Sequence, residues 1–329
     1  MESSGPTLKD IARAAGVSPR TVSNVVNGYV HVSEGVRKRV MAECERLGYR
    51  PNRAARQLRT GRSDMIALIV PDIRQPYFAA LAGAVIEAAH ARDVGVFIES
   101  TGGSLKGERA AVERVLTLGH FDGLLMTLNQ LAPTEAAAMA KVSCVFMGPT
   151  AVPDNLVHIG IDNVEAARLA TGHLLDQGCR HVAAVGVTIL QTGASESRLK
   201  GFLAAHRERG LEPGPQISVE QFSREAGVEA TRALVSGAER PDGIFAFSDL
   251  LALGALHAIR EAGLDCPRDI AVIGYDNIEE GRFAIPPLST IGADLNELAE
   301  ESLAAISAKT PESRALAMRI VARGSTARG

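Results

Sequence analysis

Arg20 and Asn24 stand in a segment, PRTVSNVVN (residues 19–27), whose residue types and spacing suggest a specific chemistry. Arginine can donate to the edge of guanine, and asparagine can pair with the edge of adenine, in the major groove of DNA. If the segment is a helix, its valines face inward and leave a polar, partly basic outer face. That face comprises Pro19, Arg20, Thr21, Ser23, Asn24 and Asn27.

Two short helices are needed to position this face. In the first, Thr7 is a suitable N-cap with Asp10 in the first turn, and apolar residues recur at helical spacing up to Ala15. Gly16 ends that helix, and Ser18-Pro19 begins the second, with serine as the N-cap. The pattern predicts a helix-turn-helix that reads DNA. A helical hairpin on a protein surface, without a ligand, is the alternative.

A third helix is predicted from about Val36 to Leu47, with Ser33 as its cap and Gly48 at its end. Residues 53–59 (RAARQLR) are compatible with a helix of only two turns. Because isolated helices this short are marginal in water, we expect this segment to be ordered only by a partner.

The charge of the chain is divided unevenly. Residues 1–62 contain 12 Lys and Arg and 5 acids, a net charge of +7, and the remainder carries −10. A basic N-terminal segment followed by an acidic remainder is expected when only the N-terminal segment binds a polyanion such as DNA. A solvated charged face is the alternative.

Composition limits the remaining classes. The chain has 329 residues, of which 46% are hydrophobic, enough for two or three domains with real cores. No apolar run approaches the length of a membrane span, and the N-terminus lacks signal-peptide character, so we expect a cytoplasmic protein. Four dispersed cysteines without a CxxC pair argue against zinc and disulfides, and favour free thiols.

From Met65 onward, apolar strands alternate with amphipathic helices. Strands are predicted at 65–70, 94–99, 123–126, 144–147, 181–187, 243–247 and 269–275, with a possible last strand at 318–323. Helices are predicted at 76–91, 108–118, 164–177, 198–209, 225–236 and 249–262. This alternation predicts an α/β core of two doubly wound parallel-sheet subdomains, before and after about Asp162, with a ligand cleft at the carboxyl ends of the strands.

The chain resembles the lac repressor (LacI/GalR) family of bacterial transcription regulators over essentially its whole length. The motifs that carry the resemblance include TLKDIARAAGVSPRTVSNVVNG, GYRPNRAARQLRTGRS, IGIDNVEAARLATGHLL, SRLKGF, FAFSDLLALGALHAIREAGL, IAVIGYDN and PPLSTI. The resemblance implies a helix-turn-helix headpiece (1–51), a hinge helix (52–63) and a core like periplasmic sugar-binding proteins (64–329). We assign 64–161 plus 293–329 to the first subdomain and 162–292 to the second.

The resemblance also implies a homodimer on a near-palindromic operator. It places Pro19, Arg20 and Asn24 at the positions that select the operator sequence. Leu58 would enter the minor groove as a wedge, although an ordinary linker leucine is the alternative. The full predicted DNA-binding set is Thr7, Ser18, Pro19, Arg20, Thr21, Ser23, Asn24, Asn27, Asn52, Ala55, Arg56 and Leu58.

A small polar effector is expected to bind the cleft and to change the geometry of the dimer. Helix 76–91 is expected to form part of the dimer interface, and the absence of a leucine-heptad tail favours a dimer over a tetramer. The effector residues carried over from the resemblance are Tyr77, Phe78, Arg198, Phe222, Ser248, Asp249 and Asp276. For the aromatic members, core packing is the alternative, and Asp162 could instead be a rim or hinge residue.

Two departures from the family pattern bear on the effector. Met147-Gly148-Pro149 stands where many sugar-responsive members carry an acidic residue, and Leu295 is aliphatic where the lac repressor is aromatic. The chain also lacks tryptophan. These features make a simple hexose or disaccharide a less favoured effector without excluding it, and the expected effector is a sugar or sugar-like metabolite.

A solute-binding transport component shares the core fold, but it would need an export signal and would lack the basic headpiece. An enzyme on a doubly wound fold is the other alternative. The sequence has no GxxxxGK[ST] loop, no GxSxG elbow and no metal-binding cluster, so we expect no catalysis, no cofactor and no bound metal.

Overall fold

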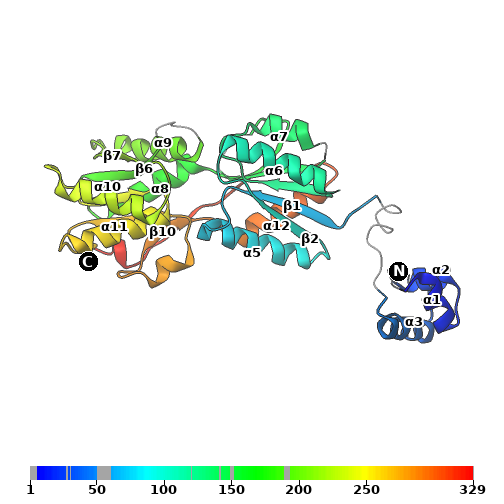
Figure 1. The fold of residues 1–329 in the computed structure, drawn as a ribbon. Coiled ribbons are helices and arrows are strands. Elements are labelled where there is room, and N and C mark those ends of the chain that lie inside the picture. The colour runs from blue at the N-terminus through cyan, green and yellow to red at the C-terminus, as the bar shows by residue number, and fades with distance from the viewer. Residues whose placement is uncertain are drawn as a thin grey trace. The chain divides into compact units, whose positions relative to one another are not determined.

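The structure is a computed structural model that describes residues 6–26, 29, 31–49, 61–119, 121–140, 142–148, 152–188 and 193–328. The chain divides into two compact units, Met1–Ser63 and Asp64–Gly329 (Figure 1). We call the first unit the headpiece and the second unit the core.

Three helices form the headpiece: α1 (Leu8–Ala15), α2 (Pro19–Val26) and α3 (Glu34–Leu47). Thr7 is the N-cap of α1, and the Asp10 carboxylate accepts from the Thr7 amide at 3.0 Å and from its hydroxyl at 2.7 Å. Gly16 and Gly48 end α1 and α3 with φ of 63° and 66°, values that favour glycine. The predicted helix-turn-helix is therefore confirmed.

The apolar faces of the three helices meet in one small core. Its fully buried members are Ile11, Ala12, Ala15, Val22, Val25, Val40 and Cys44. Since these residues recur at helical spacing in the sequence, the period that predicted the helices also selects the residues that pack between them.

The first half of the core is a six-stranded parallel sheet with the order β11-β5-β4-β3-β1-β2. Alternate residues of β1, an interior strand, pack on opposite faces: Ile66, Leu68 and Val70 against α5 and α12, and Ala67 and Ile69 against α6 and α7. This explains why β1 is apolar without interruption. The strands are β1 (Met65–Val70), β2 (Gly95–Ser100), β3 (Gly123–Met126), β4 (Cys144–Gly148), β5 (Val157–Ile161) and β11 (Arg314–Leu316), and the helices are α5 (Pro76–His90), α6 (Leu105–Leu118), α7 (Pro133–Ala140) and α12 (Leu295–Ser307).

The second half is a six-stranded sheet with the order β12-β10-β9-β8-β6-β7, parallel except for the β10–β12 pair. Helices α8 and α9 pack against each other, as do α10 and α11 (Figure 1). The strands are β6 (Val182–Val187), β7 (Gln216–Ser218), β8 (Gly243–Ala246), β9 (Ala271–Tyr275), β10 (Ser289–Gly292) and β12 (Arg319–Val321). The helices are α8 (Asn163–Asp176), α9 (Gly193–Glu208), α10 (Arg224–Ser236), α11 (Asp249–Glu261) and the 3-10 helices η1 (Glu279–Phe283) and η2 (Gly324–Thr326).

The two doubly wound sheets confirm the predicted fold class. The expected subdomain division is wrong in one detail: not all of 293–329 belongs to the first subdomain. β12 pairs with β10, and the Ser325 hydroxyl donates to Val272 of β9 at 2.6 Å, so the end of the chain belongs to the second sheet. The chain passes between the halves after β5, after β10 and after β11. Residues that follow β1 in the first sheet and β9 in the second line one cleft.

Candidate functional site

Helix α2 carries a polar face that begins at its first turn. Pro19 and Arg20 are exposed, whereas Val22 and Val25 on the opposite side are buried. The Ser18 hydroxyl accepts from the Thr21 amide at 3.1 Å and lies 2.8 Å from the Thr21 hydroxyl. These bonds fix the start of α2, so that Pro19 and Arg20 project from a defined helix end.

Several of the other headpiece cations that the structure describes are bonded within the protein. Arg37 Nη2 donates to the Tyr29 carbonyl at 2.6 Å, and Arg39 Nε donates to the Ala15 carbonyl at 3.2 Å. Exposed ion pairs join Arg13 to Asp10, Lys38 to Glu34 and Arg46 to Glu43. Arg20, by contrast, makes no ion pair with any residue that the structure describes. Within the described part of the chain, the arginine predicted to read a base is therefore not paired with a carboxylate.

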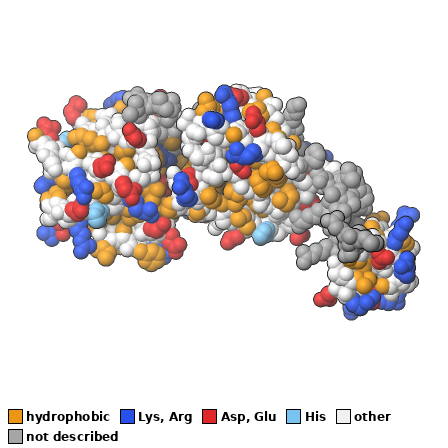
Figure 2. All heavy atoms as spheres, in the orientation of Figure 1, with side chains coloured by type: hydrophobic (Ala, Val, Ile, Leu, Met, Phe, Trp, Pro, Cys, Tyr) orange, Lys and Arg blue, Asp and Glu red, His pale blue; other side chains and the backbone are white. Residues whose placement is uncertain are grey.

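Basic side chains are prominent on the visible face of the headpiece (Figure 2). Thr7, Ser23 and Asn24 complete the predicted set within the described residues, and Asn24 is half-buried on α2. Five predicted DNA-binding residues lie outside the described residues: Asn27, Asn52, Ala55, Arg56 and Leu58.

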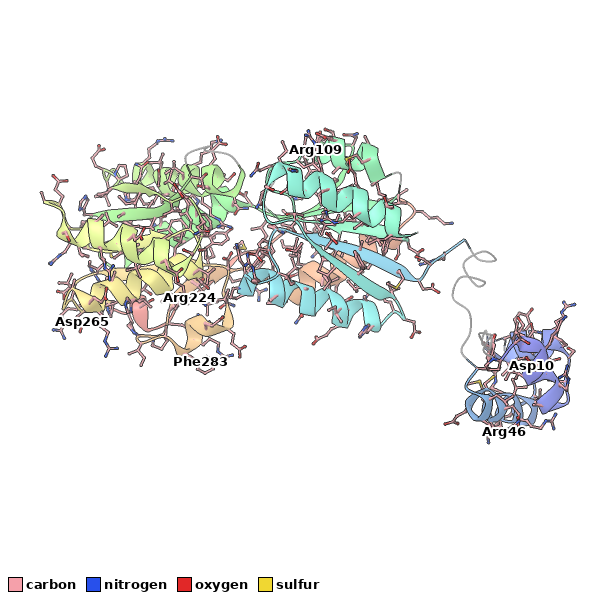
Figure 3. All side chains as sticks on the ribbon, in the orientation of Figure 1. Asp10, Arg46, Arg109, Arg224, Asp265 and Phe283 are labelled. Atoms are coloured by element: carbon pink, nitrogen blue, oxygen red, sulfur yellow. The ribbon has the colours of Figure 1, made fainter. Side chains whose placement is uncertain are left out.

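The core contains a cleft of 810 Å³ between the first turns of α5 and the loop that follows β9. Tyr77 and Leu295 line it from the first half, and Asp276 and Arg323 line it from the second. Helix η1 forms part of the rim, and Phe283 at its end is 73% exposed and points away from the core (Figure 3). A cleft of this volume fits a small-molecule ligand.

Arg198 of α9 is held behind this cleft with 8% of its surface exposed. Its Nε donates to Asn163 Oδ1 at 3.1 Å, and its Nη1 donates to the Phe247 carbonyl. The guanidinium lies over the Tyr275 ring, 3.6 Å from the centroid. These contacts fix the guanidinium plane, and Arg198 itself is not among the residues that line the cleft.

Asn163 is a site residue that the sequence analysis missed. Its Oδ1 accepts from Arg198 Nε and also from the Tyr275 hydroxyl, at 2.8 Å. One amide therefore joins α8, α9 and β9 behind the cleft. The available signal was IDN at the end of β5, but an asparagine at a helix start is ordinarily explained as a capping residue.

Asp276 follows β9, has a φ of 109°, and has no hydrogen-bond donor to its carboxylate among the described residues. Burial raises its pKa to about 7, while the charge of Arg198 acts in the opposite direction. The group is therefore a hydrogen-bond acceptor without a protein partner on the cleft wall, which suits a ligand hydroxyl or amine.

The predicted aromatic residues separate into two kinds. Tyr77 lines the cleft, and burial, with a contribution from the charge of Asp276, raises its pKa. Phe78 packs edge-to-face on Tyr77 with the centroids 5.2 Å apart, and also against the core of the first half. Phe222 packs against the core of the second half. The structure thus brings Tyr77 and Asp276 together at the cleft. Tyr77 also packs against the core of the first half, and Phe78 and Phe222 are not among the residues that line the cleft.

Asp249 and Ser248 lie behind the cleft and do not line it. Ser248 caps α11 by accepting from the Leu251 amide at 3.3 Å, and it is 3% exposed. Asp249 is fully buried, and its two oxygens accept from the Thr290 hydroxyl at 2.6 Å and from the Ile278 amide at 2.8 Å. Direct contact between Asp249 and an effector conflicts with this position. Asp162, the suggested rim residue, caps α8.

Met147 and Gly148, which differ from the family pattern at the end of β4, are held by contacts within the protein. Met147 is buried, and the Gly148 carbonyl is bonded by His158 Nε2 at 2.8 Å. Among the described residues, no group of three or more His, Cys, Asp or Glu side chains could hold a metal. In the same part of the chain, no helix is long and apolar enough to cross a membrane.

Comparison with known proteins supports both units. Residues 7–52 match the "Bacterial regulatory proteins, lacI family", and residues 171–326 match the "Periplasmic binding protein-like domain". The ribose operon repressor of Haemophilus influenzae is 34% identical over 309 residues, which are 90% of each chain. This chain therefore spans nearly all of that relative.

Solved structures agree with these matches. The lac repressor dimer bound to operator and the anti-inducer ONPF has a TM-score of 0.86 and 27% identity, covering 98% of this chain and 99% of that chain. The transcriptional regulator CelR in complex with cellobiose has a TM-score of 0.70 and 29% identity, covering 97% and 99%.

A helix-turn-helix headpiece joined to a two-sheet core with a ligand cleft defines a class of DNA-binding transcription regulators. The chain belongs to the lacI family of bacterial regulatory proteins, whose pattern it follows through both units. Regulation of transcription, rather than catalysis, is also the activity named for these relatives.

Proposed function

We propose that this protein is a cytoplasmic repressor that binds a near-palindromic operator as a homodimer, and that a small polar effector in the core cleft controls this binding. The observation that carries the proposal is Arg20, exposed and without an ion pair to a described residue on the outer face of α2. By contrast, Arg37 and Arg39 donate to backbone carbonyls, and Arg46 pairs with Glu43.

At the operator, Arg20 donates to guanine O6 and N7, Asn24 pairs with an adenine edge, and Pro19 makes an apolar contact. Each bidentate pair is worth about 1–3 kcal/mol of discrimination. Thr7, Ser18, Thr21, Ser23 and Asn27 contact phosphates and set the register. Asn52, Ala55 and Arg56 follow the minor groove, and Leu58 enters it at the operator centre.

In the cleft, Arg198 donates to the effector, Asp276 accepts from it, and Tyr77 packs on an apolar plane of it. The effector closes or twists the two halves of the core, and α5 passes the change across the dimer interface. Such coupling is typically about 1–3 kcal/mol. The lac repressor with ONPF and CelR with cellobiose support an effector of the sugar or sugar-like class.

Selection from random DNA with a gel-shift readout tests the regulator function. We expect enrichment of a near-palindromic site. Arg20→Ala should weaken binding by about 1–3 kcal/mol and relax the base preference at one position of each half-site. Arg46→Ala, which removes a cation paired with Glu43, is the matched control and should keep the wild-type preference. Failure to enrich any palindrome would contradict the proposal.

A thermal-shift screen of sugars, sugar acids, polyols and nucleosides tests the effector site. A compound that raises the melting temperature of the wild type should lose its effect on Arg198→Ala, because the planar donor is gone. Arg168→Ala is the control, since Arg168 pairs with Glu165 and Glu208 on the surface. Equal shifts in the wild type and Arg198→Ala would remove Arg198 from the site.

A further inference from the structure

A buried carboxylate lies directly beneath the wall of the cleft. Asp249 is the first residue of α11 and is fully buried. One oxygen accepts from the Thr290 hydroxyl of β10 at 2.6 Å, and the other accepts from the Ile278 amide at 2.8 Å. The Thr290 oxygen in turn accepts from the Asn277 amide at 3.3 Å. One side chain thereby joins α11, β10 and the loop after β9.

Glycine at position 274 makes room for this arrangement. A Cβ built on Gly274 would lie 2.1 Å from Asp249 Oδ1, and the next nearest atom, the Asp249 Cγ, would be at 3.1 Å. Since the carboxylate cannot move away without releasing both of its donors, a larger residue would displace it. The backbone of β9 is thus shaped to admit the Asp249 side chain.

The loop held by Asp249 has an unusual conformation. Asp276 and Asn277 have φ of 109° and 56°, in the left-handed region that side chains rarely adopt. Backbone of this kind persists only where surrounding bonds determine it. Arg323 supplies a second hold, with Nη2 donating to Asn277 Oδ1 at 2.8 Å and Nη1 donating to the Leu288 carbonyl at 2.6 Å.

We propose that Asp249 is a positioning residue, which holds the loop 275–278 so that the Asp276 carboxylate faces the cleft. It acts on the effector through Asp276 and does not touch it. The inference rests on the proposed effector role of the cleft. Because the position of Asp276 can be measured without effector or operator, failure of this inference is separable from failure of the proposed function.

Burial and neighbouring charges act on the pKa of Asp249. Burial, and then the charge of Asp276, raise the pKa of Asp249 to about 8, and the Thr290 bond and the charge of Arg323 act against this rise. Asp276 faces Arg198, Tyr77 and Tyr275 from the other side. Asparagine has the same shape as Asp249: its Oδ1 can accept from the Ile278 amide, and its Nδ2 can donate to the Thr290 oxygen in place of the bond that the hydroxyl donates to the carboxyl group.

The variants follow from this geometry. Asp249→Ala removes the bond to the Ile278 amide of the loop and the bond to the Thr290 hydroxyl of β10, whereas Asp249→Asn can form both. Thr290→Val removes only the hydroxyl link and covers the case in which Asp249→Ala does not fold. Asp242→Ala is the matched control, because Asp242 accepts from the Arg180 and His181 amides at 2.8 and 2.9 Å at the opposite end of β8.

The experiment is a titration of the full-length protein with ¹³C-carboxyl-labelled aspartate, with the Asp276 signal assigned by its loss in Asp276→Asn. The wild type should titrate at about 7. In Asp249→Ala the released Asp276 carboxyl becomes hydrated, and its midpoint should fall by about 2 units toward the ordinary value near 4. Thr290→Val should shift it in the same direction by less, and Asp249→Asn and Asp242→Ala should leave it unchanged.

Hydrogen exchange gives a second readout. The Ile278 amide should exchange about 10-fold faster or more in Asp249→Ala, and at the wild-type rate in Asp249→Asn and Asp242→Ala. The proposal is overturned if Asp249→Ala or Thr290→Val leaves the Asp276 midpoint unchanged. It is also overturned if Asp242→Ala shifts that midpoint as much as Asp249→Ala does, since a general loss of packing would then explain the result.

Discussion

The two halves of the core share one layered plan but bring unequal chemistry to the cleft. The first half contributes an aromatic ring, Tyr77, and an arginine, Arg74, whose Nη2 is already paired with Asp72 at 2.9 Å. The second half contributes Asp276, whose carboxylate has no described donor, with Arg198 fixed behind it. We infer that polar recognition is concentrated in the second half, and that the first half mainly closes the site.

Both halves hold a loop at the carboxyl end of their sheet with a buried carboxylate. In the first half, Glu108 of α6 is fully buried and accepts from the amides of Asn129, Gln130 and Leu131 at 2.8, 3.1 and 2.6 Å. In the second half, Asp249 accepts from one amide and one hydroxyl. Glu108 therefore accepts three hydrogen bonds from its loop, whereas Asp249 accepts two and has a second carboxyl group, Asp276, as its neighbour.

The largest effect should come from the first-half anchor. Glu108→Ala leaves three backbone amides without their acceptor, so the free energy of unfolding should fall by about 3–5 kcal/mol, measured by urea denaturation. Glu113→Ala, an exposed position on the same helix, is the control and should stay within about 0.5 kcal/mol of the wild type. A loss below about 1 kcal/mol for Glu108→Ala would mean that water replaces the carboxylate and that this loop needs no anchor.

The second-half carboxylate should give the fold a pH dependence. The pKa of Asp249 is raised to about 8, above its value in the unfolded chain, so the native state binds more protons between about pH 4 and pH 8. The contribution of this group to stability is therefore lost as pH rises through that window.

Asp249→Asn removes this titration. Relative to the wild type, the variant should gain at least about 2 kcal/mol of stability between pH 5 and pH 8.5, measured by urea denaturation at each pH. Asp242→Asn, at the opposite edge of the sheet, should not reproduce the gain. Parallel stability curves for the wild type and Asp249→Asn would show that Asp249 is ionised across the whole range.

The sequence predicted those elements whose pattern is set by burial alone. β1, β3, β6 and β9 are apolar throughout because both faces are covered, and their ends fall within two residues of the predicted ones. β7 and β11 have three residues each, too few to show a period. Helix α12 was missed although Asp294 caps it and its apolar residues recur at helical spacing, so its signal was present.

The sequence predicts the role of a site residue only where its partners are close to it along the chain. Ser18 caps the start of α2 and Arg20 is exposed in its first turn, as local rules predict; their contacts with DNA stay predictions. The bond between Tyr275 and Asn163 joins residues 112 positions apart, and the partners of Asp249 are 29 and 41 positions away. No local pattern distinguishes Asp249, which holds the loop, from a residue that touches a ligand, because both follow a strand end.

The smallest effect compares two tyrosines, one from each half. Tyr275→Phe removes the hydroxyl that donates to Asn163 Oδ1 at 2.8 Å, so it should cost about 1 kcal/mol of folding stability, since Arg198 Nε still satisfies the same oxygen. Tyr77→Phe should change stability by less than about 0.5 kcal/mol, because its hydroxyl makes no hydrogen bond with a described residue. Urea denaturation of both variants at pH 7 measures the difference. Equal losses would mean that the first half of the cleft is as firmly bonded as the second, and the contrast between the two halves would then rest on charge alone.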